Sequence, residues 1–111
     1  KTLAKIAQEK EIPTITKFFG TKLASELKES GKIPQLLIAN NVLAHVPEVN
    51  DFVEGLKIIL DSKGIITIEF PHLLQLIEKN QFDTIYHEHL SYFTLFSLIN
   101  QFLKIKILFL L

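Results

Sequence analysis

The chain has 111 residues, of which 48% are hydrophobic and 22% are charged, so it can form one globular domain with a modest core. Its 12 basic and 12 acidic residues give a formal net charge of zero, which argues against nucleic acid or an anionic membrane surface as a partner. Cysteine is absent, which excludes disulfides and thiolate metal sites, and no apolar run approaches the roughly 20 residues of a membrane helix. A cytoplasmic protein is the default expectation.

The first third of the chain predicts two helices separated by a short strand. Apolar side chains recur at helical spacing in residues 1–10, which predicts an amphipathic helix. Residues 14–19 follow Pro13 and predict a short strand at a sheet edge, because proline cannot donate to a ladder. Residues 21–29 predict a second helix, and Gly31 is expected to adopt the left-handed conformation that closes it.

Two apolar runs in the middle of the chain predict buried strands. Residues 33–39 and 65–70 lack polar alternation, which is typical of strands covered on both faces. Between them, residues 50–62 have helical spacing, and Asn50 is expected to cap the start of that helix. Strands and helices that alternate at these lengths predict an α/β fold with a parallel sheet.

The last third of the chain begins with a short predicted helix around residues 73–77. An irregular connection follows and contains residues 86–93, after which residues 95–103 predict another helix. Residues 104–111 are apolar except for Lys104 and Lys106 and predict a final strand.

The segment 86–89 has the sequence Tyr-His-Glu-His and is the richest in ionisable groups. The chain has four histidines, and the two outside this segment, His45 and His72, each follow a predicted buried strand. Parallel α/β sheets collect reactive groups beyond the carboxyl ends of their strands, so we expect a shared site there. His89 beside Glu88 is suited to act as a general base, because an imidazole titrates near neutral pH.

Other interpretations of the histidines stay open. His87 and His89 can serve only to satisfy buried backbone groups. They can also chelate a metal with His45 or His72, because residues two apart share a face of an extended segment. The helical metalloprotease motif, however, requires two histidines four residues apart.

Two further sets of polar side chains are candidates for ligand contacts. Tyr86 and Tyr92 can each donate a hydrogen bond to a developing oxyanion. Asn40 and Asn41 directly follow a predicted buried strand, where an α/β fold places polar cofactor contacts. A simple turn is the alternative interpretation of this asparagine pair, and the Phe18-Phe19 pair is expected in the core.

Several blocks of sequence resemble one family, the S-adenosylmethionine-dependent C-methyltransferases that act on nucleotide-linked 4-keto-6-deoxy sugars. The two longest are NNVLAHVP at residues 40–47 and DTIYHEHLSYF at residues 83–93. Ile12-Pro13-Thr14, Phe18-Phe19 and Glu69-Phe70-Pro71-His72-Leu73-Leu74 complete the pattern in the same order.

The resemblance implies a fold and a reaction. The implied fold is a Rossmann-like class I methyltransferase sheet, three-layered (α/β/α) with mostly parallel strands, beside a small zinc domain and a C-terminal domain. In the implied reaction a base removes the hydrogen next to the 4-keto group. The resulting enolate then attacks the methyl group of S-adenosylmethionine. The implied substrate is a nucleotide-linked deoxysugar.

The resemblance also assigns roles to residues. His89 is the implied base and Glu88 its partner or substitute, while Tyr86 and His45 hold the sugar and its keto oxygen. No residue is assigned to a metal. The residues implied to lie against the methionine part of the cofactor are Ala39, Asn40 and Asn41.

The chain departs from the family pattern in its cofactor motifs. Its four glycines form no cluster, and the zinc cysteines are missing. We therefore expect residues 1–111 to be a partial, incomplete methyltransferase domain, with 1–103 family-like and 104–111 a divergent terminal strand. Such a fragment is expected to transfer methyl groups weakly or not at all. The alternative is a non-catalytic α/β module that self-associates through an exposed sheet edge.

Overall fold

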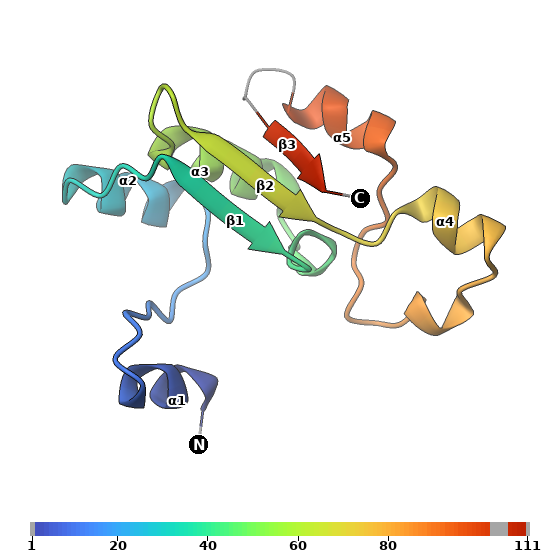
Figure 1. Ribbon diagram of the computed structural model, residues 1–111, viewed down its shortest axis with the longest axis horizontal. Helices are drawn as coiled ribbons and strands as arrows, with labels where there is room; N and C mark the ends of the chain where they lie inside the picture. The colour runs from blue at the N-terminus through green and yellow to red at the C-terminus, as the bar shows by residue number, and fades with distance from the viewer. Residues whose placement is uncertain (1, 103–106, 111) are drawn as a thin grey trace.

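Three parallel strands form the sheet in a computed structural model of the protein, which describes residues 2–102 and the backbone of residues 107–110 (Figure 1). The strands are β1 (Leu36–Asn40), β2 (Ile65–Glu69) and β3 (Ile107–Leu110), in the order β1-β2-β3. Leu36 pairs with Ile65 and Asn40 with Glu69, so β1 and β2 end together. The predicted parallel α/β sheet is confirmed, and the final strand is confirmed over residues 107–110, whereas residues 104–106 and 111 lie outside the described residues.

Short helices connect and cover the strands. They are α1 (Leu3–Glu9), α2 (Thr21–Glu29), α3 (Val49–Ile59), α4 (Leu73–Glu78) and α5 (Leu95–Phe102), with 3-10 turns η1 (Leu43–His45) and η2 (Phe82–Thr84). Across residues 2–102 and 107–110, none of them combines the length and apolar character needed to span a bilayer. Gly31 has φ of 81°, which confirms the predicted left-handed turn after α2.

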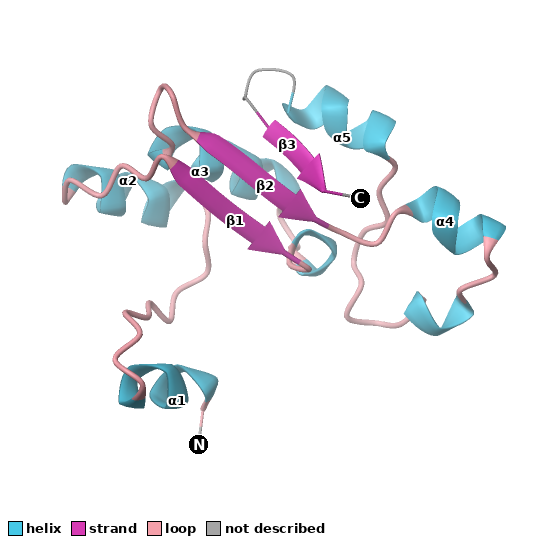
Figure 2. Cartoon of the chain, in the orientation of Figure 1, coloured by secondary structure: helices cyan, strands magenta, loops and turns pink. Residues whose placement is uncertain are grey.

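The helices that pack on the sheet lie on one face of it, as the view past β1 and β2 to α3 shows (Figure 2). Ile66 and Ile68 are fully buried on that face. On the opposite face Leu36 is 56% exposed and Ile38 is 65% exposed. Within the described residues the fold therefore has two layers, and the expectations of three layers and of strands buried on both faces are wrong.

One hydrophobic cluster forms the core between this face of the sheet and helices α3 and α5. Leu98 and Phe102 of α5 are almost completely buried in it, which confirms the predicted last helix as far as residue 102. Burial of such side chains is the main term that stabilises a small domain. The cluster consists of Ala39, Leu43, Phe52, Val53, Leu56, Ile66, Ile68, Phe70, Leu98 and Phe102.

Two predictions for the first half of the chain are wrong. Residues 14–19 form no strand and run as irregular chain between α1 and α2. Asn50 does not cap α3, because the helix already begins at Val49. Asp51 instead accepts hydrogen bonds from the backbone N–H (3.2 Å) and the hydroxyl (2.6 Å) of Thr21. A carboxylate from α3 therefore caps the first turn of α2.

Helices α2 and α3 approach each other at two glycines. A Cβ atom added to Gly55 would lie 2.7 Å from the carbonyl carbon of Gly20, which is closer than real Cβ contacts come. The close approach places Phe19 against Phe52 with 5.6 Å between ring centroids. Phe19 is half-buried, whereas Phe18 is 96% exposed, so the expectation of a core position is wrong for Phe18.

Candidate active site beyond the ends of β1 and β2

Asn41 turns the chain at the end of β1. Its φ of 52° is left-handed, a conformation that asparagine tolerates better than most residues. Its backbone N–H donates to the Glu69 carbonyl oxygen (2.9 Å), and its side-chain Nδ2 donates to Glu69 Oε1 (2.7 Å). Asn41 therefore ties the ends of β1 and β2 together and directs the chain into η1, which carries His45.

His45 reaches across to the Tyr-His-Glu-His segment. Its Nδ1 lies 2.8 Å from the backbone carbonyl oxygen of Glu88. Because a carbonyl only accepts hydrogen bonds, we assign the proton to Nδ1 and the free lone pair to Nε2. Among the described residues no partner of Nε2 is recorded, so this lone pair is available to a ligand. The ring is half-buried.

The backbone fixes the same two segments to each other. The Ala44 carbonyl oxygen accepts from the N–H groups of Leu90 (2.8 Å) and Ser91 (3.3 Å). Residues 43–45 and 88–91 are therefore held side by side by three hydrogen bonds when that of His45 is included. This pairing explains how residues over 40 positions apart come to share one site.

His89 lies at the centre of the candidate site. Its Nδ1 is 2.7 Å from the Thr84 carbonyl oxygen, which again assigns the proton to Nδ1. Its Nε2 therefore accepts the hydrogen bond from the Tyr86 hydroxyl (3.1 Å). The His89 ring centroid lies 4.8 Å from that of His45 and 4.3 Å from that of Tyr86. The Tyr92 ring meets His89 edge-on at 6.1 Å.

The structure brings together most of the side chains that the sequence singled out. His45, Tyr86 and His89 converge, and Glu88 joins them through its backbone carbonyl. The Glu88 side chain is exposed and has no recorded hydrogen-bond partner among the described residues. His87 is also exposed and outside the cluster. Nowhere in the described part of the chain do three potential metal ligands gather.

His72 lies outside the cluster and holds together the two ends of the segment that contains Tyr86 and His89. Its Nε2 lies 2.9 Å from the Leu95 N–H and its Nδ1 lies 3.2 Å from the Leu74 N–H. A neutral imidazole has one lone pair, so it accepts from one of these donors at a time. The Leu73 N–H also donates to the Phe93 carbonyl oxygen (2.8 Å). His72 therefore positions the starts of α4 and α5.

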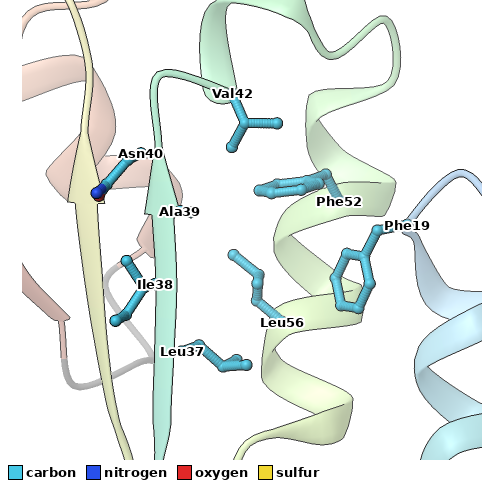
Figure 3. Close-up of a pocket in the computed structure, with 8 residues that line it drawn as sticks. All are labelled: Phe19, Leu37, Ile38, Ala39, Asn40, Val42, Phe52 and Leu56. Carbon is cyan, nitrogen blue, oxygen red and sulfur yellow. The ribbon is translucent and has the colours of Figure 1, made fainter. Parts of the chain in front are cut away.

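Two adjacent cavities share part of their walls, and one of them borders the cluster through His45. One of about 450 Å³ includes His45 and Glu48 in its wall. The other, of about 330 Å³, lies between β1 and α3, with Leu56 and Phe52 facing β1 (Figure 3). The residues shared by both walls, which the sequence did not mark as functional, are Phe19, Val42 and Phe52. Gly20, which follows Phe19, was the feature of the sequence that could have indicated these residues, because a glycine there permits the close approach of α2 and α3.

Ala39 and Asn40 line the smaller cavity and were expected to contact the cofactor, but their side chains differ in orientation. Ala39 is buried and belongs to the core cluster on the helix side. The Asn40 side chain points to the opposite side of β1 from Phe52 (Figure 3). This follows from the alternation of side chains along a strand.

Parallel α/β sheets commonly bind ligands beyond the carboxyl ends of their strands, and the cluster of His45, Tyr86 and His89 follows the end of β1. No family model matches the chain. The chain is similar to the C-methyltransferase NovU of Streptomyces niveus, with 33% identity over 102 residues, or 92% of this chain. It spans 24% of the length of that relative.

Proposed function

We propose that this chain carries the substrate side of a C-methyltransferase site that acts on a nucleotide-linked 4-keto-6-deoxy sugar. The main support is the contact between the His45 and His89 rings, with Tyr86 bonded to His89, beyond the end of β1. Two imidazoles and a phenol form a set of groups suited to proton removal and oxyanion stabilisation. The similarity to a C-methyltransferase supports carbon as the methylated atom.

His89 is the proposed base, through Nε2. The hydrogen next to a ketone is acidic because the electron pair left on carbon delocalises onto the keto oxygen. When Nε2 takes this proton, the C–H bond breaks, an N–H bond forms and the negative charge resides on the enolate oxygen. The Thr84 carbonyl oxygen, 2.7 Å from Nδ1, then stabilises the imidazolium through the second N–H.

Tyr86 changes its hydrogen-bond partner when the substrate binds. Its hydroxyl occupies His89 Nε2 at 3.1 Å, so the substrate has to displace it before proton transfer. The displaced hydroxyl is then free to donate a hydrogen bond to the enolate oxygen, where charge develops. The lone pair on His45 Nε2 accepts from a sugar hydroxyl. The exposed Glu88 carboxylate lies one residue from His89 and is the substitute base.

S-adenosylmethionine is the proposed methyl donor and supplies an electrophilic methyl group when bound. The smaller cavity has an apolar wall that fits the methylthio part of this cofactor, and Ala39 and Asn40 border it. Among the described residues no carboxylate lines that cavity to bind ribose hydroxyls, and the Asn41 amide already binds Glu69. The described residues therefore do not fit the whole cofactor, and no step of the proposed reaction is assigned to it.

Solvent exchange tests the base without the cofactor. The chain is incubated in D2O with a nucleotide-linked 4-keto-6-deoxy sugar, and deuterium uptake next to the ketone is followed by NMR. We expect uptake above the buffer rate, lost in His89→Gln and retained in His87→Gln, whose exposed ring lies outside the cluster. Equal uptake in the wild-type protein and His89→Gln would show that His89 is not the base.

A further inference from the structure

The backbone holds the two imidazoles of the candidate site in the same way. His45 Nδ1 lies 2.8 Å from the Glu88 carbonyl oxygen. His89 Nδ1 lies 2.7 Å from the Thr84 carbonyl oxygen. Because both Nδ1 atoms donate, the lone pair of each neutral ring is on Nε2. This is the usual state of a histidine that binds a metal ion, since a carbonyl group behind the ring fixes its tautomer and its orientation.

The spacing of the two rings matches that of imidazoles that share one ion. A Zn²⁺ ion lies about 2.0–2.1 Å from an imidazole nitrogen, and so about 3.2 Å from the ring centroid. Two imidazoles on one tetrahedral ion therefore have centroids about 5 Å apart. The centroids of His45 and His89 are 4.8 Å apart, and the two rings are tilted by 57° rather than stacked.

One hydrogen bond competes with an ion at this position. The Tyr86 hydroxyl lies 3.1 Å from His89 Nε2 and donates to it. An ion that binds this nitrogen has to displace the hydroxyl, as the substrate does in the proposed reaction. The loss of one such hydrogen bond corresponds to about a two- to tenfold change in affinity.

The other two histidines of the chain do not form a second site of this kind. His72 Nδ1 lies 3.2 Å from the Leu74 N–H, and its Nε2 lies 2.9 Å from the Leu95 N–H, so both ring nitrogens face backbone donors. His87 is exposed and outside the cluster, so it offers a single imidazole. The pair of His45 and His89 is therefore the set of histidines that the fold arranges for chelation.

We propose that His45 and His89 bind one divalent transition-metal ion through their Nε2 atoms, and that this ion blocks proton removal by His89. Imidazole nitrogen is a ligand that suits Zn²⁺, Cu²⁺ and Ni²⁺. Within the described residues, histidine and acidic side chains do not gather in threes, so the ion has two protein ligands and water completes its coordination. The bound ion takes up the lone pair that would accept the proton. The inhibition therefore rests on the proposed function, whereas the binding does not.

Isothermal titration calorimetry of the 111-residue chain with zinc chloride tests the binding. We expect one saturable ion per chain, with an affinity about tenfold lower or more when either ligand is removed. The ligand variants are His89→Gln and His45→Asn, and the latter keeps a donor to the Glu88 carbonyl oxygen. His87→Gln is the matched control and should bind Zn²⁺ as the wild type does. Equal affinity in the wild type and both ligand variants would overturn the proposal.

Tyr86→Phe tests the same site by a gain of affinity, which a misfolded variant would not show. The substitution removes the hydroxyl that competes for His89 Nε2, so Zn²⁺ should bind about two- to tenfold more tightly. Weaker binding in Tyr86→Phe would overturn the two-histidine site, because the phenol would then be a ligand of the ion.

Deuterium exchange on the sugar, with and without zinc chloride, tests the inhibition. We expect uptake next to the ketone to stop at saturating Zn²⁺ and to return when EDTA removes the ion. Uptake that persists at saturating Zn²⁺ would overturn the inhibition. If the chain binds Zn²⁺ at the two histidines but shows no uptake even without the ion, the proposed function fails and the metal site stands.

Discussion

The His45 ring and the Glu88 backbone are joined by a 2.8 Å hydrogen bond across 43 residues of chain. This bond connects the turn after β1 to the Tyr-His-Glu-His segment and leaves His45 Nε2 with no recorded partner among the described residues. His45 thus combines a structural hydrogen bond at one ring nitrogen with an available lone pair at the other. Substitutions that keep one feature and remove the other can separate the two roles.

The variants His45→Asn and His45→Ala separate the structural hydrogen bond at Nδ1 from the available lone pair at Nε2. The asparagine Nδ2 can replace the donor to Glu88, so His45→Asn should keep the segment in place and lose deuterium exchange on the sugar. His45→Ala removes both features and should also lower the free energy of unfolding by about 0.5–1.5 kcal/mol, the usual contribution of one hydrogen bond. Urea titration and amide hydrogen exchange of residues 86–90 measure these effects. Full exchange on the sugar in His45→Asn would exclude a role for Nε2.

His72 should act through the two helix starts it contacts. Asparagine places an acceptor near the position of Nδ1, and glutamine places one near that of Nε2. We therefore expect His72→Asn to keep protection of the Leu74 amide and lose that of Leu95, and His72→Gln to do the reverse. Hydrogen exchange resolved by NMR measures both amides. Equal protection in both variants would contradict a positioning role through these two contacts.

Gly55→Ala should destabilise the junction of α2 and α3. The added Cβ would lie 2.7 Å from the Gly20 backbone, which cannot rotate away as a side chain would. Overpacking of this kind typically costs about 1–3 kcal/mol. Gly31→Asn is the matched control, because its site is open and asparagine tolerates a φ of 81° better than other residues. A Gly55→Ala midpoint in urea equal to that of the wild type would contradict the close approach.

The sequence was sufficient to predict the parallel sheet and the meeting of distant polar groups. Both follow from local patterns, since strand and helix lengths imply crossovers and parallel strands end on one side. The topology places His45 beyond the end of β1, whereas His89 meets it through the hydrogen bonds that Ala44 accepts from Leu90 and Ser91.

Features that depend on tertiary contacts were not predictable from local patterns. An apolar run such as 36–39 looks the same whether one or both sheet faces are covered. Residues 14–19 have strand-like composition, but a strand also requires a neighbour for its hydrogen bonds. Asp51 caps α2 rather than its own helix, and that choice depends on how α2 and α3 pack.

Glu26 should make stability depend weakly on pH. The hydrogen bond from Lys17 (2.7 Å) and the positive charge of that lysine lower the pKa of Glu26 below its ordinary value of 4.5. A carboxyl group whose pKa is lowered by folding stabilises the protein above its unfolded pKa, and this stabilisation is lost as the pH falls through the folded pKa. NMR titration should show the lower midpoint, and Lys17→Met should raise it. Unchanged midpoints would indicate that this exposed ion pair does not form in solution.

S-adenosylmethionine should bind the chain weakly. In the part of the chain that the structure describes, the cavity beside Ala39 is lined by apolar side chains and one asparagine, with no charged side chain for the amino-acid part or the ribose of the cofactor. Burying those polar groups without partners is costly, so we expect no saturable heat at micromolar concentrations in isothermal titration calorimetry. Phe52→Ala enlarges the cavity without adding a polar partner and should bind no better. Micromolar affinity of the wild-type chain would show that residues other than those of this cavity hold the cofactor.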